Sequence, residues 1–236
     1  MRILFIKPNM GLVRGTPYVD RGRMEPLTFA VLGGFTPPGH DLHLCDDRME
    51  AVPYDEPWDL VGINTEIYTA RRAYEIADRF RAQGVKVVLG GCHTSLVPEE
   101  SAPHADAIAI GELDGVWADL VSDAARGALQ PRYTGRPGGD LGAFAPRFEL
   151  FQGKRYLPVT LSQLSRGCMN ACEYCVTGNL YRGRAFVRAP RAVADELQRR
   201  NRKLVFFVDD NLLADEAAAR ALFQALIPLR LRWTAQ

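Results

Sequence analysis

Short apolar runs alternate with helical segments along the first 130 residues, and this alternation constrains the fold more than any other feature. Residues 69–84 carry apolar side chains at helical spacing and end at Gly84, a helix stop signal. The β-branched runs that flank this helix and recur around it are typical of strands buried in a parallel sheet, at residues 2–7, 59–64, 85–91 and 105–112. The sequence therefore predicts an α/β fold that begins with a Rossmann-like, doubly wound parallel sheet, which binds ligands at the carboxyl ends of its strands.

Further segments of the chain show the same alternation of strands and helices. Residues 41–45 are predicted as a further strand, and residues 25–35 and 114–126 as helices. A segment rich in Gly and Pro follows and is typical of a connector between domains. The alternation then resumes, with strands at 157–165, 203–211 and 229–235 and helices at 191–200 and 215–227. We predict three parts: residues 1–133, a linker over 134–157, and residues 158–236.

Composition limits the class of protein. Of 236 residues, 47% are hydrophobic and 24% are charged, which is ordinary for a globular domain. No apolar run reaches the roughly 20 residues that span a bilayer, and the start, MRILFIKPNM, lacks the features of a signal peptide. Five cysteines, three of them crowded together, do not form a secreted disulfide framework. We expect a cytoplasmic protein with reduced thiols and no membrane partner.

The net charge of +1 conceals an asymmetry. Residues 1–150 carry 15 Lys and Arg against 21 Asp and Glu, whereas residues 151–236 carry 14 against 7. A basic excess can attract nucleic acid or other anions, but no block of basic residues is interleaved with aromatic ones here. The pattern favours arginines spread over solvated helices, and no nucleic-acid partner is predicted.

Three cysteines, Cys168, Cys172 and Cys175, stand in the stretch SRGCMNACEYC directly after a predicted strand. With the spacing C-x3-C-x2-C, three thiolates can bind three irons of a cubane cluster and leave the fourth iron open. Structural zinc needs four ligands, and every histidine and both other cysteines lie in the first half of the chain. A redox pair would leave Cys168 unexplained, and a buried thiol cluster fits poorly with so polar a loop.

The cysteine stretch resembles the signature of the radical S-adenosylmethionine (SAM) enzymes, including an aromatic residue before the third cysteine, Tyr174, which the resemblance implies as a SAM-binding residue. The resemblance implies a partial (β/α)6 barrel, a 4Fe-4S cluster whose open iron chelates SAM, and radical chemistry after SAM is cleaved. It also implies that a polar segment after the second barrel strand contacts the SAM amino group, here Asp209, Asp210 and Asn211. The alternative is that these residues cap the next helix, a role that Asp215 fills more naturally.

The first half resembles the cobalamin-binding subgroup of radical SAM proteins, in which a Rossmann-like domain holds vitamin B12. The resemblance rests on four stretches, at residues 21–34, 59–91, 89–100 and 108–117. The chain contains no D-x-H-x-x-G segment, the pattern by which some B12 proteins supply a histidine to cobalt. The residues that the resemblance implies for cobalamin follow predicted strands and are Asn64, Thr65, Gly90, Gly91, His93 and Glu112.

The predicted barrel is short. Only 68 residues follow Cys168, enough for about three strands at the repeat length of a barrel of about 250 residues. We therefore expect a chain that is incomplete alone, completed by a second polypeptide or lying within a longer one. The alternatives are a non-catalytic module that binds cobalamin or a cluster, an accessory subunit, and a zinc-stabilised nucleic-acid protein.

In complete relatives of this kind, the reaction is methyl transfer to carbon, rearrangement or cyclisation, and the resemblance implies a flavodoxin or ferredoxin as reductant. The substrate, a small molecule or a peptide, and the catalytic residues are not readable from the sequence.

Overall fold

The computed structural model describes residues 1–236 except 19, 21, 137–144, 171 and 236. Its described residues fall into two compact units, called unit 1 (residues 1–136 and 145–155) and unit 2 (residues 156–235). Part of the predicted linker, residues 137–144, lies outside the described residues. Each unit has its own hydrophobic core, so each is described by itself.

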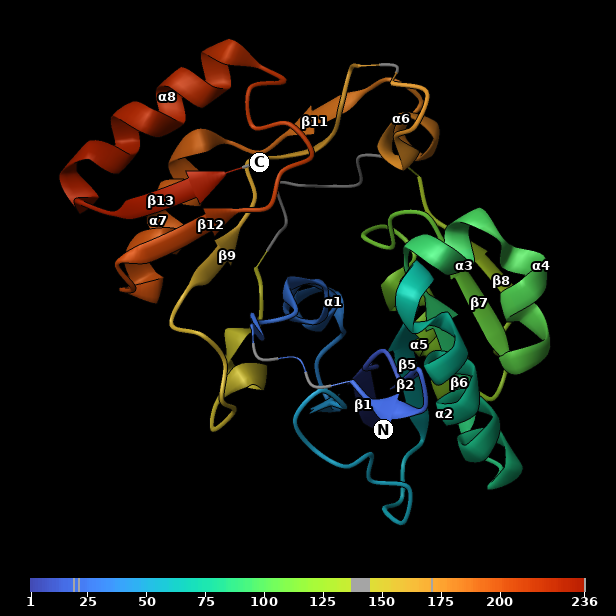
Figure 1. Ribbon diagram of the computed structural model, residues 1–236. Coiled ribbons are helices and arrows are strands. Elements are labelled where there is room, and N and C mark those ends of the chain that lie inside the picture. The colour runs from blue at the N-terminus through green and yellow to red at the C-terminus, as the bar shows by residue number, and fades with distance from the viewer. Residues whose placement is uncertain (19, 21, 137–144, 171, 236) are drawn as a thin grey trace. The chain divides into compact units, whose positions relative to one another are not determined.

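Unit 1 is built on a six-stranded sheet in which every neighbouring pair is parallel, in the order β4-β1-β5-β6-β7-β8 (Figure 1). The chain adds β4 on one side of β1 and then β5 on the other, so the strand order reverses at β1. This topology confirms the predicted parallel sheet. The strands are β1 (Arg2–Lys7), β4 (Asp41–Asp46), β5 (Leu60–Asn64), β6 (Lys86–Gly90), β7 (Ala107–Ile110) and β8 (Arg132–Thr134).

Helices cover both faces of this sheet. Successive side chains of β1 point to opposite faces, and the two sets pack against different helices. Leu4 and Ile6 join the core that contains the buried face of helix α2 (Ala70–Ala82). Phe5 instead stacks on Phe29 of α1 (Leu27–Phe35) and lies against Trp117 of α5 (Trp117–Ala125). The sheet is therefore doubly wound, as predicted. The shorter elements of unit 1 are β2 (Leu12–Val13), β3 (Thr16–Pro17), η1 (Ile67–Thr69), α3 (Cys92–Leu96), α4 (Pro98–Ser101), η2 (Ala102–His104) and η3 (Phe148–Phe151).

Strand β8 was not predicted, since the connector was expected to begin at this point. It pairs with β7 and buries Tyr133, whose hydroxyl donates a hydrogen bond to Asp123 at 2.8 Å. A three-residue strand is too short to show a period in the sequence, and the Gly and Pro residues around it signal a loop.

Unit 2 contains a three-stranded parallel sheet, in the order β13-β12-β9, with helix crossovers between successive strands (Figure 1). The helices pack on the sheet through a cluster that includes Val193, Leu197, Val205 and Leu222. These repeated β-α units agree with the prediction, while closure into a barrel stays a prediction. The elements are β9 (Thr160–Ser162), α7 (Pro190–Arg200), β12 (Leu204–Phe207), α8 (Glu216–Leu226), η4 (Ile227–Leu229) and β13 (Arg232–Ala235).

The predicted strand 157–165 is corrected by the structure. Strand β9 ends at Ser162, and Ser165–Gly167 form a separate strand, β10, in an antiparallel hairpin with β11 (Ala185–Val187). Helix α6 (Val176–Tyr181) lies between the two hairpin strands in the chain. The chain leaves the parallel sheet because the backbone N–H groups of Leu164 and Ser165 bond to the Asp209 carboxylate instead of to a neighbouring strand.

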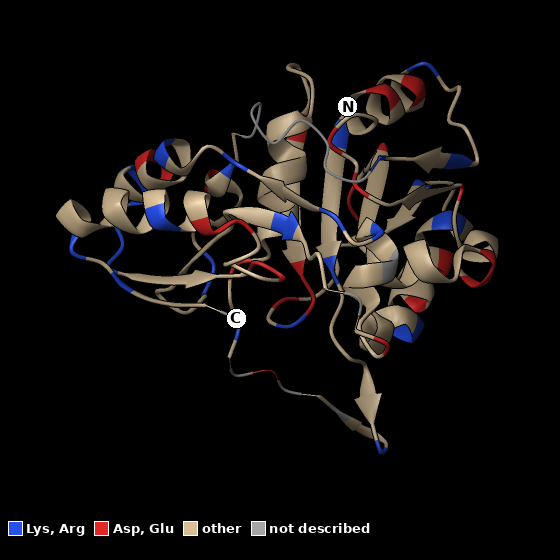
Figure 2. Ribbon diagram, turned by 90° about the horizontal axis from the view of Figure 1, so that it is seen from above, with Lys and Arg blue, Asp and Glu red and all other residues tan. Residues whose placement is uncertain are grey.

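Lys and Arg residues of unit 2 occur on helices, strands and loops, with four of them close together at residues 199–203, and Figure 2 shows them in blue. This distribution agrees with the expected spread of arginines. Within the described part of the chain, no helix combines the length and the apolar character that crossing a membrane requires.

Candidate functional site

The three clustered cysteines lie between strand β10 and helix α6, in a stretch called the cysteine loop (residues 168–175). Residue 171 of this loop is outside the described residues. All three thiols are free; Cys172 is exposed, and Cys168 and Cys175 are half-buried. The Cys175 N–H donates to the Cys172 carbonyl at 3.0 Å, and the Asn170 N–H points to the Cys168 Sγ at 3.4 Å.

Cys175 is the N-cap residue of α6, whose first backbone N–H groups have no partner within the helix. Hydrogen bonding from the Thr177 backbone N–H lowers the pKa of the Cys175 thiol. Tyr174 is 90% exposed, and a hydrogen bond to Cys172 raises the pKa of its phenol. The lowered pKa of Cys175 favours the thiolate, which is the form that binds iron or zinc.

The donor set of the cysteine loop fits an iron-sulfur cluster in kind, because three thiols stand within eight residues. Among the described residues, no group of three or more His, Cys, Asp or Glu side chains is arranged to hold a metal ion.

Asp209 follows strand β12 and is completely buried. It accepts hydrogen bonds from the Leu164 N–H at 3.1 Å, the Ser165 N–H at 2.5 Å and the Ser165 hydroxyl at 2.8 Å. Burial raises the pKa of this carboxyl, and the hydrogen bonds from Ser165 oppose that rise. The carboxylate is therefore used within the protein, and a direct contact with SAM stays a prediction.

Asp210 and Asn211 lie closer to solvent and also contact the cysteine loop or the residues that flank it. The Asp210 carboxylate accepts the Gly167 N–H at 2.8 Å and the Thr177 hydroxyl at 3.0 Å. Asn211 points its amide Nδ2 at the Cys168 Sγ, 3.8 Å away. The structure thus brings Asp209, Asp210 and Asn211 to the cysteine loop or to the residues that flank it, while their contact with SAM stays a prediction. The expected helix cap is Asp215, which accepts the Ala218 N–H at 2.9 Å.

The residues predicted to bind cobalamin gather at the carboxyl ends of β5, β6 and β7. Asn64 lies beside Gly90 in the sheet register, and the Thr65 N–H donates to the Gly90 carbonyl at 2.6 Å. Thr65 is fully buried, and its Oγ1 has no hydrogen-bond partner among the described residues. Glu112 follows β7 by two residues.

Gly91 and His93 have structural partners in unit 1. Gly91 has a φ of +105°, and a Cβ there would stand 2.3 Å from the Asn64 Oδ1, so the close approach of the two strand ends requires glycine. The His93 Nε2 lies 3.2 Å from the Glu100 Oε1. Their roles toward a ligand stay predictions.

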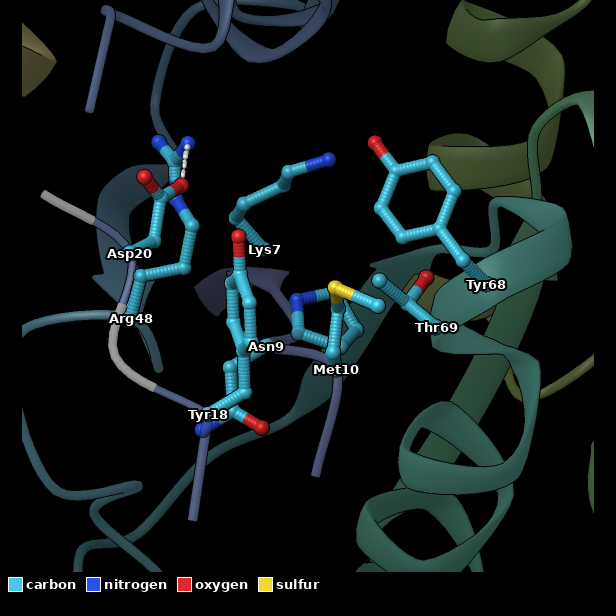
Figure 3. Close-up of a pocket in the computed structure, with 9 residues that line it drawn as sticks. Lys7, Asn9, Met10, Tyr18, Asp20, Arg48, Tyr68 and Thr69 are labelled. Atoms are coloured by element: carbon cyan, nitrogen blue, oxygen red, sulfur yellow. Dashed lines mark hydrogen bonds and ion pairs between the residues drawn. The ribbon is translucent and has the colours of Figure 1, made fainter. Parts of the chain in front are cut away.

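A pocket of about 440 Å³ opens at the carboxyl end of β1 (Figure 3). An ion pair between Arg48 and Asp20 lies at one end of the pocket, and Tyr68 lies at the other end. Arg48 also pairs with the buried Asp46 at 2.8 Å. The residues that line the pocket lie at the end of β1 or after β1, β3, β4 and β5 and are Lys7, Pro8, Asn9, Met10, Tyr18, Asp20, Arg48, Tyr68 and Thr69.

None of the six residues predicted for cobalamin lines this pocket. Lys7 is 7% exposed and pairs with Glu66 at 2.6 Å, and its ammonium lies 6.0 Å from the centre of the Tyr68 ring. Burial, and then a hydrogen bond to Glu66, raise the pKa of the Tyr68 phenol. The sequence signal that could have indicated this pocket is a charged residue, Lys7, directly after the apolar residues Ile3–Ile6 of β1.

The chain is similar in sequence to curated methyltransferases, although no protein-family model matches it. Bacteriochlorophyllide d C-8(2)-methyltransferase of Chlorobaculum tepidum is 35% identical over 193 residues, which cover 76% of this chain and 42% of that protein. Bacteriochlorophyllide d C-12(1)-methyltransferase of the same organism is 27% identical, over 92% of this chain and 51% of that protein. Hopanoid C-2 methylase of Rhodopseudomonas palustris is 28% identical, over 96% of this chain and 46% of that protein. The chain thus spans about half the length of these relatives or less.

Among solved structures, the radical S-adenosylmethionine methyltransferase TsrM of Kitasatospora setae, bound to tryptophan and a SAM analogue, has a similar fold. The TM-score is 0.72 at 15% identity, over 98% of this chain and 53% of TsrM. The homologues are therefore methyltransferases, and the fold is shared with a radical SAM methyltransferase.

Proposed function

We propose that this chain belongs to the cobalamin-dependent radical SAM methyltransferases and takes part in methyl transfer to carbon. The observation that carries the proposal is the C-x3-C-x2-C loop, which follows the first parallel strand of unit 2 in a fold similar to that of a radical SAM methyltransferase. The named relatives act on bacteriochlorophyllides and hopanoids, so the methyl acceptor is proposed to be a large hydrophobic molecule.

Cys168, Cys172 and Cys175 would hold a 4Fe-4S cluster. Such a cluster, when bound, supplies the electron that cleaves SAM. The chain contributes thiolates, and the N–H groups at the start of α6 favour the ionised form of Cys175. Asn211 is a better-placed candidate for SAM than Asp209, because Asp209 is fully buried.

Cobalamin would lie along the carboxyl ends of the unit 1 strands, where parallel sheets bind their ligands. The pocket volume of about 440 Å³ falls within the range of small-molecule sites, and we propose that it takes one edge of the ligand. Met10, Tyr18 and Tyr68 offer apolar surface there. The pairing of His93 with Glu100 favours a role other than cobalt ligation.

Anaerobic purification and reconstitution with iron and sulfide test the cluster. We expect about four irons and four sulfides per chain and a broad absorbance near 400 nm. A chain in which all three loop cysteines are replaced by Ala should bind none. The matched control is Cys92→Ala, which removes a half-buried thiol of unit 1.

Stoichiometric zinc in place of iron would contradict the proposal and favour a zinc-stabilised protein. Retention of cobalamin on a sizing column, lost on substitution of Tyr68 by Ala, tests the proposed cobalamin site. A chain that retains cobalamin or the cluster but neither binds nor cleaves SAM would instead be a binding module or an accessory subunit.

A further inference from the structure

The turn that follows strand β12 accepts hydrogen bonds from both sides of the cysteine loop. On the N-terminal side, Gly167 directly precedes Cys168, and on the C-terminal side Thr177 follows Cys175 by two residues. Both donate to one carboxylate, that of Asp210, at 2.8 Å and 3.0 Å. A single side chain 33 residues further along the chain than Thr177 therefore joins the two ends of the loop.

The two bonds use different oxygens of this carboxylate. The Gly167 N–H bonds to Oδ2, and the Thr177 hydroxyl bonds to Oδ1. A carboxylate can accept at both oxygens at once, and hydrogen bonds to a charged acceptor are stronger than neutral ones. One carboxylate therefore bonds to both ends of the loop at once.

The neighbouring residues hold Asp210 in place. Asp209 is anchored to Leu164 and Ser165 from the buried side of the turn. The Asn211 side chain accepts the Leu213 N–H at 3.1 Å, which closes the turn on its other side. A residue fixed on both sides can position a loop more precisely than one on a mobile segment.

We infer that Asp210 is a positioning residue that brings the two ends of the cysteine loop together, so that the three thiols can bind one cluster. The inference rests on the proposed function, since it concerns the cluster proposed there. It differs from the SAM contact expected for Asp210, because both of its oxygens are used within the chain.

The test compares two substitutions of Asp210 in the full chain. Asp210→Ala removes both acceptors, while Asp210→Asn keeps one acceptor oxygen. With the metal-free chain, hydrogen exchange at the Gly167 amide should become about tenfold faster in Asp210→Ala, with a smaller change in Asp210→Asn. After reconstitution, loss of iron to a chelator should follow the same order, and the electron paramagnetic resonance signal of the reduced cluster should change.

Asp215→Ala is the matched control, because Asp215 also accepts a backbone N–H but at the start of α8. It should lower the unfolding temperature and leave Gly167 exchange, iron loss and the resonance signal as in the wild type. Equal iron loss in Asp210→Ala and Asp215→Ala would overturn the inference. If the wild-type chain assembles no cluster, the proposed function itself fails, whatever the exchange data show.

Discussion

At the scale of single residues, Gly167 is the position where the cysteine loop depends most on the absence of a side chain. Its φ is +84°, and a Cβ would stand 2.2 Å from the Arg184 carbonyl oxygen across the hairpin. We expect Gly167→Ala to lower the free energy of unfolding of unit 2 by more than about 2 kcal/mol, because left-handed strain and a backbone clash add.

The control is Gly183→Ala in the same unit. Gly183 has a φ of +67°, but no described atom lies within 4 Å of the position that a Cβ would occupy, so only the backbone strain of about 1 kcal/mol applies. Urea denaturation of both variants measures the difference. Equal losses would show that the β10–β11 hairpin adjusts to a methyl group.

Cys45 gives a pH dependence of known sign. It is 3% exposed in unit 1, and burial raises the pKa of its thiol to about 12. The unfolded chain ionises this thiol near pH 9, so above that pH the unfolded state binds fewer protons than the folded state. The contribution of the protonated Cys45 thiol to the free energy of unfolding is therefore fully present below pH 9. It falls as the pH rises toward 12, by up to about 1.4 kcal/mol per pH unit.

Cys45→Ala removes this contribution, so its free energy of unfolding should fall less steeply than that of the wild type between about pH 9 and the folded-state pKa of about 12. Chemical denaturation at several pH values measures the two slopes. In the folded wild type, iodoacetamide should label the exposed Cys172 and spare Cys45. Identical slopes in the two proteins would contradict the expected ionisation.

Residue-level prediction from the sequence named candidate side chains, whose roles toward ligands stay predictions, and was less informative about the contacts that these side chains make within the chain. The spacing of Cys168, Cys172 and Cys175 and the strand before them indicated their placement on one loop. That Asp209 is buried against Leu164 depends on a contact between residues 45 positions apart. No periodic pattern encodes such a contact.

At the scale of elements, a buried ion pair joins the segment just before helix α7 to the middle of that helix. Arg188 and Glu196 lie 2.8 Å apart, with both side chains 5% exposed, and Arg188 also donates to the Gln163 carbonyl at 2.9 Å. Removing one partner leaves the other charge buried. We expect Glu196→Ala to lower the free energy of unfolding of unit 2 by about 3–5 kcal/mol.

A second ion pair on the same helix provides the comparison. Arg191 and Asp195 lie 3.1 Å apart, with side chains 76% and 41% exposed. Asp195→Ala should cost less than about 0.5 kcal/mol, because exposed pairs contribute little. Urea denaturation of both variants checks the contrast, which disappears if water reaches Glu196 in the folded state.

The predicted elements with a clear period were the ones that formed. Helix α2 buries Ala73, Ile76, Ala77 and Phe80, the four residues at helical spacing in the sequence. The β10–β11 hairpin and β8 escaped prediction because each strand has three residues. Such strands are defined by their partners and not by their own side chains.

At the scale of the whole molecule, the two hydrophobic cores share no residue among those described. We expect two unfolding transitions, one for each unit. Trp58 and Trp117 are buried in unit 1, and Trp233 lies in unit 2. In a Trp233→Phe background, fluorescence should report unit 1 alone.

In that background, adding Glu196→Ala should leave the fluorescence transition unchanged while the loss of helical circular dichroism begins at lower urea. A shift of both signals by the same amount would show that the two units unfold together. The parallel order of both sheets followed from the β-α alternation, since short crossovers place consecutive strands side by side.

The hydrogen bonds that hold the cysteine loop determine which positions tolerate substitution. The donors at Leu164 and Gly167 are backbone N–H groups, which any residue except proline supplies. Met169, Asn170 and Glu173 are exposed, so we expect the loop to tolerate substitutions at these positions. A library randomised at these three positions should therefore keep more iron-binding clones than one randomised at residues 209–211, where the acceptors are side chains.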